Sequence, residues 1–178
     1  MKKSLLVIFL VITGYANAQI YLTRSGFIGF YSKTPLEDIR AENKQVVAVI
    51  DAGKRNIAFS LLVKGFVFTK QLMQEHFNEN YIESDKFPKS SFTGSYTGDV
   101  DLNKNGIYKV LAKGQLTLHG VTKAIEIPAT IEVQNGKLIG KADFKITPGD
   151  FHIKIPSLVR EEIAEQIAVR VSVECSLK

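Results

Sequence analysis

The stretch GQLTLHGVTKAIEIPATIEV (residues 114–133) contains two runs of alternating apolar and polar residues that meet at His119-Gly120. A period of two is typical of a β-strand with one buried face. Glycine adopts backbone conformations that let the chain reverse sharply. The stretch therefore predicts two strands joined by a tight turn. His119 falls on the polar face, where its ring can brace the turn by hydrogen-bonding backbone groups.

The same alternation recurs along the chain and is clearest in IAVRVSVECSL (residues 167–177). Asn105-Gly106 and Asn135-Gly136 favour hairpin turns, and AGKRN at 52–56 suggests a hairpin between 44–51 and 57–63. We count roughly eight antiparallel strands in one all-β domain, which predicts a closed barrel or a sandwich. Closure would remove the exposed strand edges that invite aggregation.

Three short segments favour helices. Thr34 to Glu37 has capping-box spacing with proline at the first helical position, which predicts a helix over 34 to about 43. KQLMQEHFN (residues 70–78) and SLVREEIAEQ (residues 157–166) are the other two candidates. We therefore expect one to three short helices beside the strands.

The first 18 residues have the order of a signal peptide. A basic start is followed by an apolar run at 4–14 and by the small-x-small sequence Ala16-Asn17-Ala18. This predicts a periplasmic or secreted protein, cut near Ala18, whose single domain covers 19–178. No later apolar run is long enough to cross a bilayer, so we do not expect a membrane-embedded chain.

Composition narrows the function further. The formal charge is +5 at pH 7, but the basic residues are scattered, which gives no indication of nucleic-acid binding. The one cysteine, Cys175, cannot form an internal disulfide, so the core must stabilise the fold. Cys175 lies on the apolar face of its strand, where we expect a buried, inert thiol.

The residues needed for catalysis are not arranged in any recognisable motif. The three histidines, His76, His119 and His152, are not spaced as metal ligands, and one cysteine is too few for a thiolate site. There is no G-x-S-x-G sequence and no glycine-rich phosphate loop. We therefore predict no catalytic residues, no metal and no enzyme activity. A hydrolase with His119 or His152 as base is the weaker alternative, because neither has a nucleophile placed near it.

The face of the strands that we expect to point inward includes small residues among large apolar ones. They leave empty volume for an apolar guest, or they relieve bending where strands curve. The residues alone favour neither interpretation. The small residues are Gly94, Gly98, Ala112, Gly114, Gly140 and Ala142.

The stretch GQLTLHGVTK (residues 114–123) resembles the signature of the YceI family, with Leu116, Thr117, His119 and Gly120 in the motif turn. Residues 76–92 and 155–169 are similar to two further family blocks. The chain departs from the family pattern at 19–32, which lack the Asp-x-x-His-Ser sequence of many relatives. The resemblance implies an exported lipocalin-like barrel that binds a polyprenyl phosphate or an isoprenoid quinone, and it favours the cavity interpretation.

We therefore expect a non-enzymatic carrier or store whose partner is an apolar lipid. A Lys or Arg of the loops would meet a charged head group, and the oligomeric state is left open. The alternative is an interaction or stress-response module with a filled core, and interior volume separates the two. The residues expected around the lipid tail are Phe59, Leu61, Phe92, Tyr96, Leu116, Leu118, Ile125, Ile127, Phe144 and Ile146.

Overall fold

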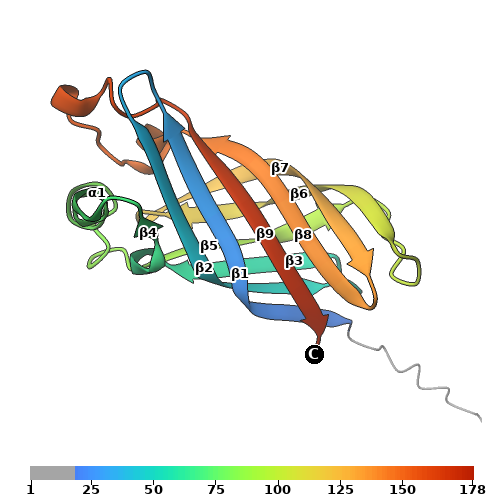
Figure 1. Cartoon of the computed structure of the whole chain (residues 1–178). Helices are drawn as coiled ribbons and strands as arrows, with labels where there is room; N and C mark the ends of the chain where they lie inside the picture. The colour runs from blue at the N-terminus through green and yellow to red at the C-terminus, as the bar shows by residue number, and fades with distance from the viewer. Residues whose placement is uncertain (1–18) are drawn as a thin grey trace, which may run out of the picture.

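The structure, a computed structural model, describes residues 19–178. The expected signal peptide, residues 1–18, lies outside the described residues. Eight antiparallel strands close into a barrel, because the first strand pairs with both the second and the last (Figure 1). The strands follow the order β1-β9-β8-β7-β6-β5-β3-β2 around the barrel, and the short β4 pairs with β2 outside this ring. The all-β prediction and the count of roughly eight strands are confirmed.

The barrel strands are long enough for alternate side chains to line the interior from one end to the other. Their bounds are β1 (Ile20–Lys33), β2 (Asp38–Asp51), β3 (Asn56–Leu62), β4 (Val67–Phe68), β5 (Lys89–Thr97), β6 (Gly106–Leu118), β7 (Val121–Gln134), β8 (Lys137–Ile146) and β9 (Ile167–Leu177).

The turn between β6 and β7 contains only His119 and Gly120, since Leu118 pairs with Val121. Both turn residues have positive φ, 51° and 73°, the conformation of a two-residue hairpin turn that matches strand twist. Asn135 and Gly136 repeat this geometry between β7 and β8, with φ of 50° and 77°. The turns predicted at His119-Gly120 and Asn135-Gly136 are confirmed, whereas the turn predicted at Asn105-Gly106 is wrong, because Gly106 is already the first residue of β6.

One of the three predicted helices forms. The helix α1 (Gln71–His76) continues into a π-helical turn over Phe77–Tyr81, so this helix lies within and just beyond the predicted 70–78. The prediction over 157–166 is wrong: only Ser157–Val159 form a 3-10 turn. There Val159 and Ile163 turn inward to line a cavity, and the Ala164 N–H donates to the buried Ser32 hydroxyl over 2.8 Å. These contacts hold the segment as an irregular loop.

The predicted helix over 34–43 is also wrong. The Thr34 hydroxyl does accept hydrogen bonds from backbone N–H groups, including that of Glu37 at 3.1 Å, as a helix cap would. The chain then reverses instead of coiling, and β2 begins at Asp38. Ile39 and Ala41 alternate inward, and this strand period, supported by pairing along β1, overrides the local capping signal.

The interior has two parts. The part nearest the β7–β8 turn is filled by the protein's own side chains, among them Ile50, Tyr96, Ile131, Leu138 and Cys175. The part at the other end contains a second apolar cluster beneath β4, α1 and the connection from β8 to β9, which gather there (Figure 1).

The small residues of the inward face do not open the cavity. Gly94 on β5 pairs directly with Gly114 on β6, and a Cβ on either one would collide with backbone of the other strand. The two glycines therefore permit a close approach of strands, as bending would require. The cavity interpretation of these residues is wrong, since none of the six lines the cavity described below.

Candidate functional site

A cavity of about 260 Å³ lies inside the barrel at the α1 end. Its walls come from β1, β2, β3, β5, β6, β8 and β9, and α1 and the segment before β9 help to enclose it. Most of the lining is apolar. An apolar cavity of about 150 Å³ already accepts a benzene-sized guest in another protein, so this one is large enough for part of a hydrocarbon chain.

Four phenylalanines form one wall of the cavity. Phe77 of the helix lies with its ring centroid 5.0 Å from that of Phe68 and 5.4 Å from that of Phe30, and Phe66 lies 5.1 Å from Phe30. Tilted and edge contacts of this kind stabilise a cluster beyond simple burial. The cluster anchors α1 and β4 to the barrel and leaves ring surface facing the cavity.

The structure divides the ten residues expected around the tail. Five line the cavity: Leu61, Leu116, Leu118, Phe144 and Ile146. The other five do not. Phe92, Tyr96 and Ile127 belong to the filled part, Ile125 packs against that part, and Phe59 packs against both parts of the interior.

Sequence reasoning missed the residues that the connections contribute. Phe66, Phe68 and Phe77 lie outside the long strands, and Ile153 and Ile163 belong to the loop before β9. The alternation in GFVFT (residues 65–69) signals that Phe66 and Phe68 share a face. Nothing in the irregular loop predicts which of its residues turn inward.

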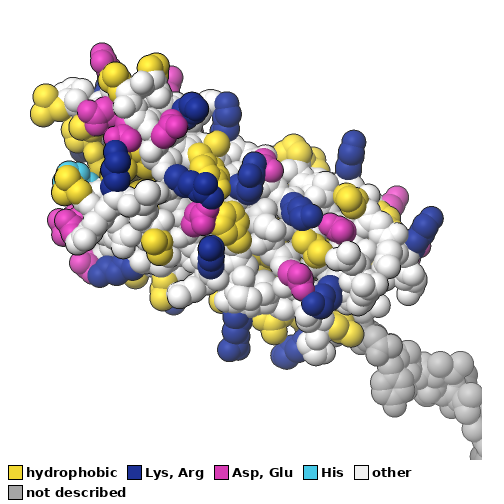
Figure 2. Space-filling view, in the orientation of Figure 1, with side chains coloured by type: hydrophobic (Ala, Val, Ile, Leu, Met, Phe, Trp, Pro, Cys, Tyr) yellow, Lys and Arg dark blue, Asp and Glu magenta, His cyan; other side chains and the backbone are white. Residues whose placement is uncertain are grey.

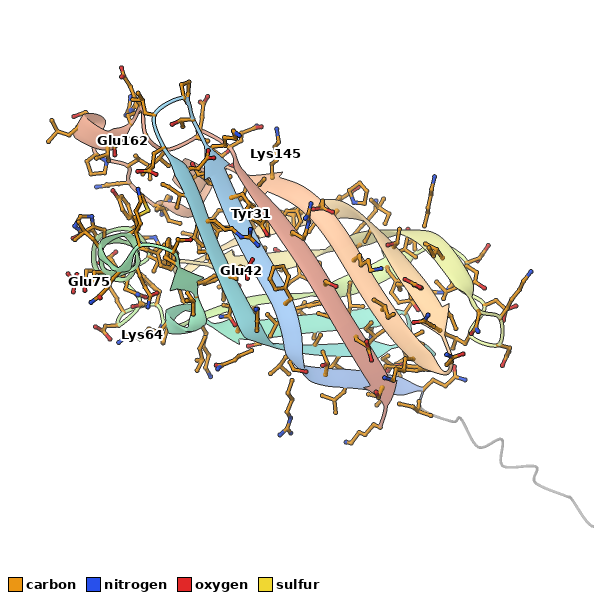
Figure 3. The ribbon with its side chains drawn as sticks, viewed as in Figure 1. Tyr31, Glu42, Lys64, Glu75, Lys145 and Glu162 are labelled. Atoms are coloured by element: carbon orange, nitrogen blue, oxygen red, sulfur yellow. The ribbon has the colours of Figure 1, made fainter. Side chains whose placement is uncertain are left out.

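Polar side chains lie where the cavity reaches the surface. His76 of α1 and Glu162 of the loop before β9 both line the cavity and are exposed, and Tyr81 and Glu37 lie at its edge. Figure 3 places Glu162 on that loop, at the same end as α1. Among the described residues, no Lys or Arg lines the cavity itself, although Lys70 pairs with Glu37 at its edge.

The charges at this opening affect one another. Lys70 donates to both carboxylate oxygens of Glu37, at 3.0 and 2.9 Å, and this hydrogen bonding is the main cause that lowers the pKa of Glu37. Burial raises the pKa of Tyr81, and the negative charge of Glu162 raises it further. Glu162 and the Tyr81 hydroxyl therefore share the opening.

His119 is buried rather than exposed on the polar face, which corrects its expected position. Its Nδ1 donates to the carbonyl of Phe151 at 3.0 Å and its Nε2 to the Glu83 carboxylate at 2.9 Å. Together the two hydrogen bonds engage both nitrogens of the ring. Thr117, also in the motif turn, shares a hydrogen bond with Thr122 across the hairpin.

These contacts make His119 a brace. It does support the turn, but its partners lie on two other connections rather than in the turn itself. Its ring also packs against Phe87, with centroids 4.5 Å apart, and a Cβ at Gly120 would collide with that same ring. With both nitrogens engaged, His119 has no free position from which to act as a base. His152 is exposed, in the left-handed conformation with φ of 57°.

Two kinds of feature are missing from residues 19–178. They contain no cluster of three or more His, Cys, Asp or Glu side chains arranged to hold a metal ion. Within the same residues, no helix is both long and apolar enough to span a bilayer.

Comparison with known proteins identifies the domain. The family model described as "YceI-like domain" matches residues 23–175. No curated protein matches the sequence significantly. The match covers most of the chain, including the motif turn, all of β2 to β8 and the cavity walls.

Solved structures share the fold at low sequence identity. A polyisoprenoid binding domain from Saccharophagus degradans, implicated in plant cell wall breakdown, is 13% identical with a TM-score of 0.75, covering 90% of this chain and 99% of that one. BcnA of Burkholderia cenocepacia is 14% identical (TM-score 0.69, 85% and 96%). The YceI protein of Campylobacter jejuni is 21% identical (TM-score 0.62, 78% and 84%).

Proposed function

We propose, since the chain belongs to the YceI-like domain family, that it is a non-enzymatic binding protein for an isoprenoid or similar apolar lipid. The lipid tail lies in the cavity at the α1 end of the barrel. The protein is exported to the periplasm or beyond, and acts there as a carrier or store. The observation that carries this proposal is the apolar cavity of about 260 Å³, enclosed by strands and a helix.

The cavity provides the binding energy. Burying hydrocarbon stabilises a complex by about 0.8 kcal/mol per methylene group, less the cost of ordering the ligand. Branched isoprene units suit a wall of phenylalanine rings and aliphatic side chains such as Leu116 and Ile146. The similar Saccharophagus degradans domain, described as polyisoprenoid binding, supports this class of ligand.

The filled half of the barrel favours the second candidate, an interaction module without a lipid. Tyr96, Ile131 and Cys175 leave no room for a guest there. That half also accounts for the stability of a fold without an internal disulfide. The cavity at the other end does not stabilise the fold in this way. We therefore prefer the function of a lipid carrier.

Two measurements test the carrier. Mass spectrometry of an organic extract of natively purified protein should show a polyprenyl or similar apolar species. Leu118→Trp should then abolish uptake of an added prenol, because the indole fills the cavity that Leu118 lines. The matched control is Ile107→Trp, on the same strand but exposed and remote from the cavity.

The control should bind like the wild type. The carrier proposal is refuted if the isolated protein contains no lipid and takes up neither prenols nor quinones. Equal uptake by Leu118→Trp and Ile107→Trp would place the ligand somewhere other than this cavity.

A further inference from the structure

The charged groups that line the cavity are acidic. Glu37 and Glu162 face it, and neither Lys nor Arg does among the described residues. Lys70 is nearby, but both of its short contacts go to Glu37. Lys33 and Arg160 line a neighbouring shallow groove instead of this cavity. A ligand whose tail fills the cavity therefore presents its polar end to carboxylates.

The segments around the opening also carry more negative than positive charge. Four stretches connect strands at this end: 34–37, 63–88, 119–120 and 147–166. Together they contain nine Asp and Glu but only five Lys and Arg, whereas the whole chain has more basic than acidic residues. Figure 2 shows acidic side chains gathered around this end and Lys and Arg spread along the barrel. The opening is thus an acidic region on a basic protein.

We propose that the lipid held in this cavity has a head group without negative charge, so that a prenol, a quinone or a prenyl amine binds and a prenyl phosphate is rejected. This inference rests on the proposed function. Like charges at an apolar opening repel more strongly than in bulk water, because the low-dielectric wall screens them poorly. A phosphate would also lose water there without gaining a cationic partner.

Two groups at the opening suit an uncharged head. The Glu162 carboxylate has no ion-pair partner among the described residues and accepts hydrogen bonds from a hydroxyl or an amine. The Tyr81 hydroxyl can donate to a quinone carbonyl. A tyrosine hydroxyl is protonated at neutral pH, and burial followed by the charge of Glu162 raises the pKa of Tyr81 further, so this hydroxyl remains a donor.

The experiment compares three ligands with the same fifteen-carbon tail: farnesol, farnesyl amine and farnesyl phosphate. Their dissociation constants are measured by calorimetry at low salt. We expect farnesyl phosphate to bind roughly tenfold more weakly than farnesol, the effect of like charges about 10 Å apart. Glu162→Gln should reduce the ratio of the two dissociation constants severalfold. Glu162→Lys should make the two ligands bind equally well, or make farnesyl phosphate the tighter ligand.

The control is Glu126→Gln, which removes the same charge from an exposed position on β7 outside the cavity. It should leave this ratio unchanged. The inference is overturned if farnesyl phosphate binds as tightly as farnesol, or if Glu162→Gln and the wild type discriminate equally between the two ligands. Either result would leave the proposed carrier function intact. If none of the three ligands binds, the proposed function itself fails.

Discussion

The Nε2 atom of His119 donates a hydrogen bond to the carboxylate of Glu83 across 2.9 Å, and this bond joins the β6–β7 turn to the segment that follows the helix. The Nδ1 atom extends the link to the carbonyl of Phe151, on the connection between β8 and β9. One imidazole thus fastens together three connections at the open end of the barrel. Two of these connections, through Tyr81 and Ile153, also line the cavity.

Replacing His119 by asparagine should destabilise the protein. Asparagine tolerates the positive φ of this position, so the turn persists, but neither hydrogen bond can form. Leaving the carbonyl of the buried Phe151 unsatisfied costs about 1–3 kcal/mol in the free energy of unfolding, measured by urea denaturation. Thr122→Ala, which removes an exposed hydrogen bond at the same hairpin, should cost far less. Equal stability of the His119→Asn and wild-type proteins would contradict the bracing role.

The contact between His119 and Glu83 should make the free energy of unfolding depend on pH in the acidic range. The hydrogen bond from His119 is the main cause that lowers the pKa of Glu83, and Lys86 adds to it. A carboxyl whose pKa is lowered on folding stabilises the fold above its unfolded pKa, and this contribution disappears as the pH falls through the lowered value. Glu83→Gln should therefore be less stable than the wild type near neutral pH.

The stabilities of the two proteins should converge as the pH falls below the ordinary pKa of a glutamate and then through the lowered pKa of Glu83. Urea denaturation at a series of pH values measures this difference. A gap between wild type and Glu83→Gln that stays constant over the whole range would show that the His119 contact does not shift the titration of Glu83.

The barrel was predictable because its signal is repeated in nearly every strand. Alternation such as that of Ile167 to Leu177 depends only on which side chains meet the core, and Asn135-Gly136 has the backbone freedom its turn requires. The helix expected after Thr34 failed because a capping signal is local, whereas the pairing of β2 with β1 joins eleven pairs of residues. Long-range pairing outweighed local preference.

The cavity was only half predictable, for a physical reason. A period of two shows that Leu118 and Tyr96 both point inward, but not how far along the barrel each one lies from the end that stays open. Which half is filled depends on where bulky side chains from different strands meet. Glu162 and Ile163 lie in an irregular loop whose inward residues follow from tertiary contacts alone.

Gly114→Ala should be strongly destabilising. The new methyl group would collide with the Thr93 carbonyl oxygen and lie within 2.7 Å of the Phe92 ring. Overpacking of this kind costs about 1–3 kcal/mol or more, because the strands must separate. Gly149→Ala is the control, since no heavy atom lies within 4 Å of its added methyl group. Thermal unfolding compares the two variants. Similar melting temperatures would show that β5 and β6 can separate without loss of stability.

The thiol of Cys175 should be unreactive in the folded protein. The residue is fully buried, and burial raises the pKa of the thiol to about 11, so little thiolate exists near pH 8. A maleimide or disulfide reagent should label Cys175 only after unfolding. Ser176→Cys places a second thiol at the exposed neighbouring position, which should react at once. Rapid labelling of the wild type would show that the filled half opens.

The two halves of the interior should respond differently to truncation. Ile131 is buried in the filled half, so Ile131→Ala should cost about 2–5 kcal/mol in the free energy of unfolding while leaving prenol affinity unchanged. Met73 is half-buried and lines the cavity, so Met73→Ala should cost less stability but weaken prenol binding severalfold, because tail contacts are lost. Urea denaturation and calorimetry on the same samples separate the two effects. Loss of affinity in Ile131→Ala at a temperature where it remains folded would mean that the tail extends past the cavity into the half that we regard as filled.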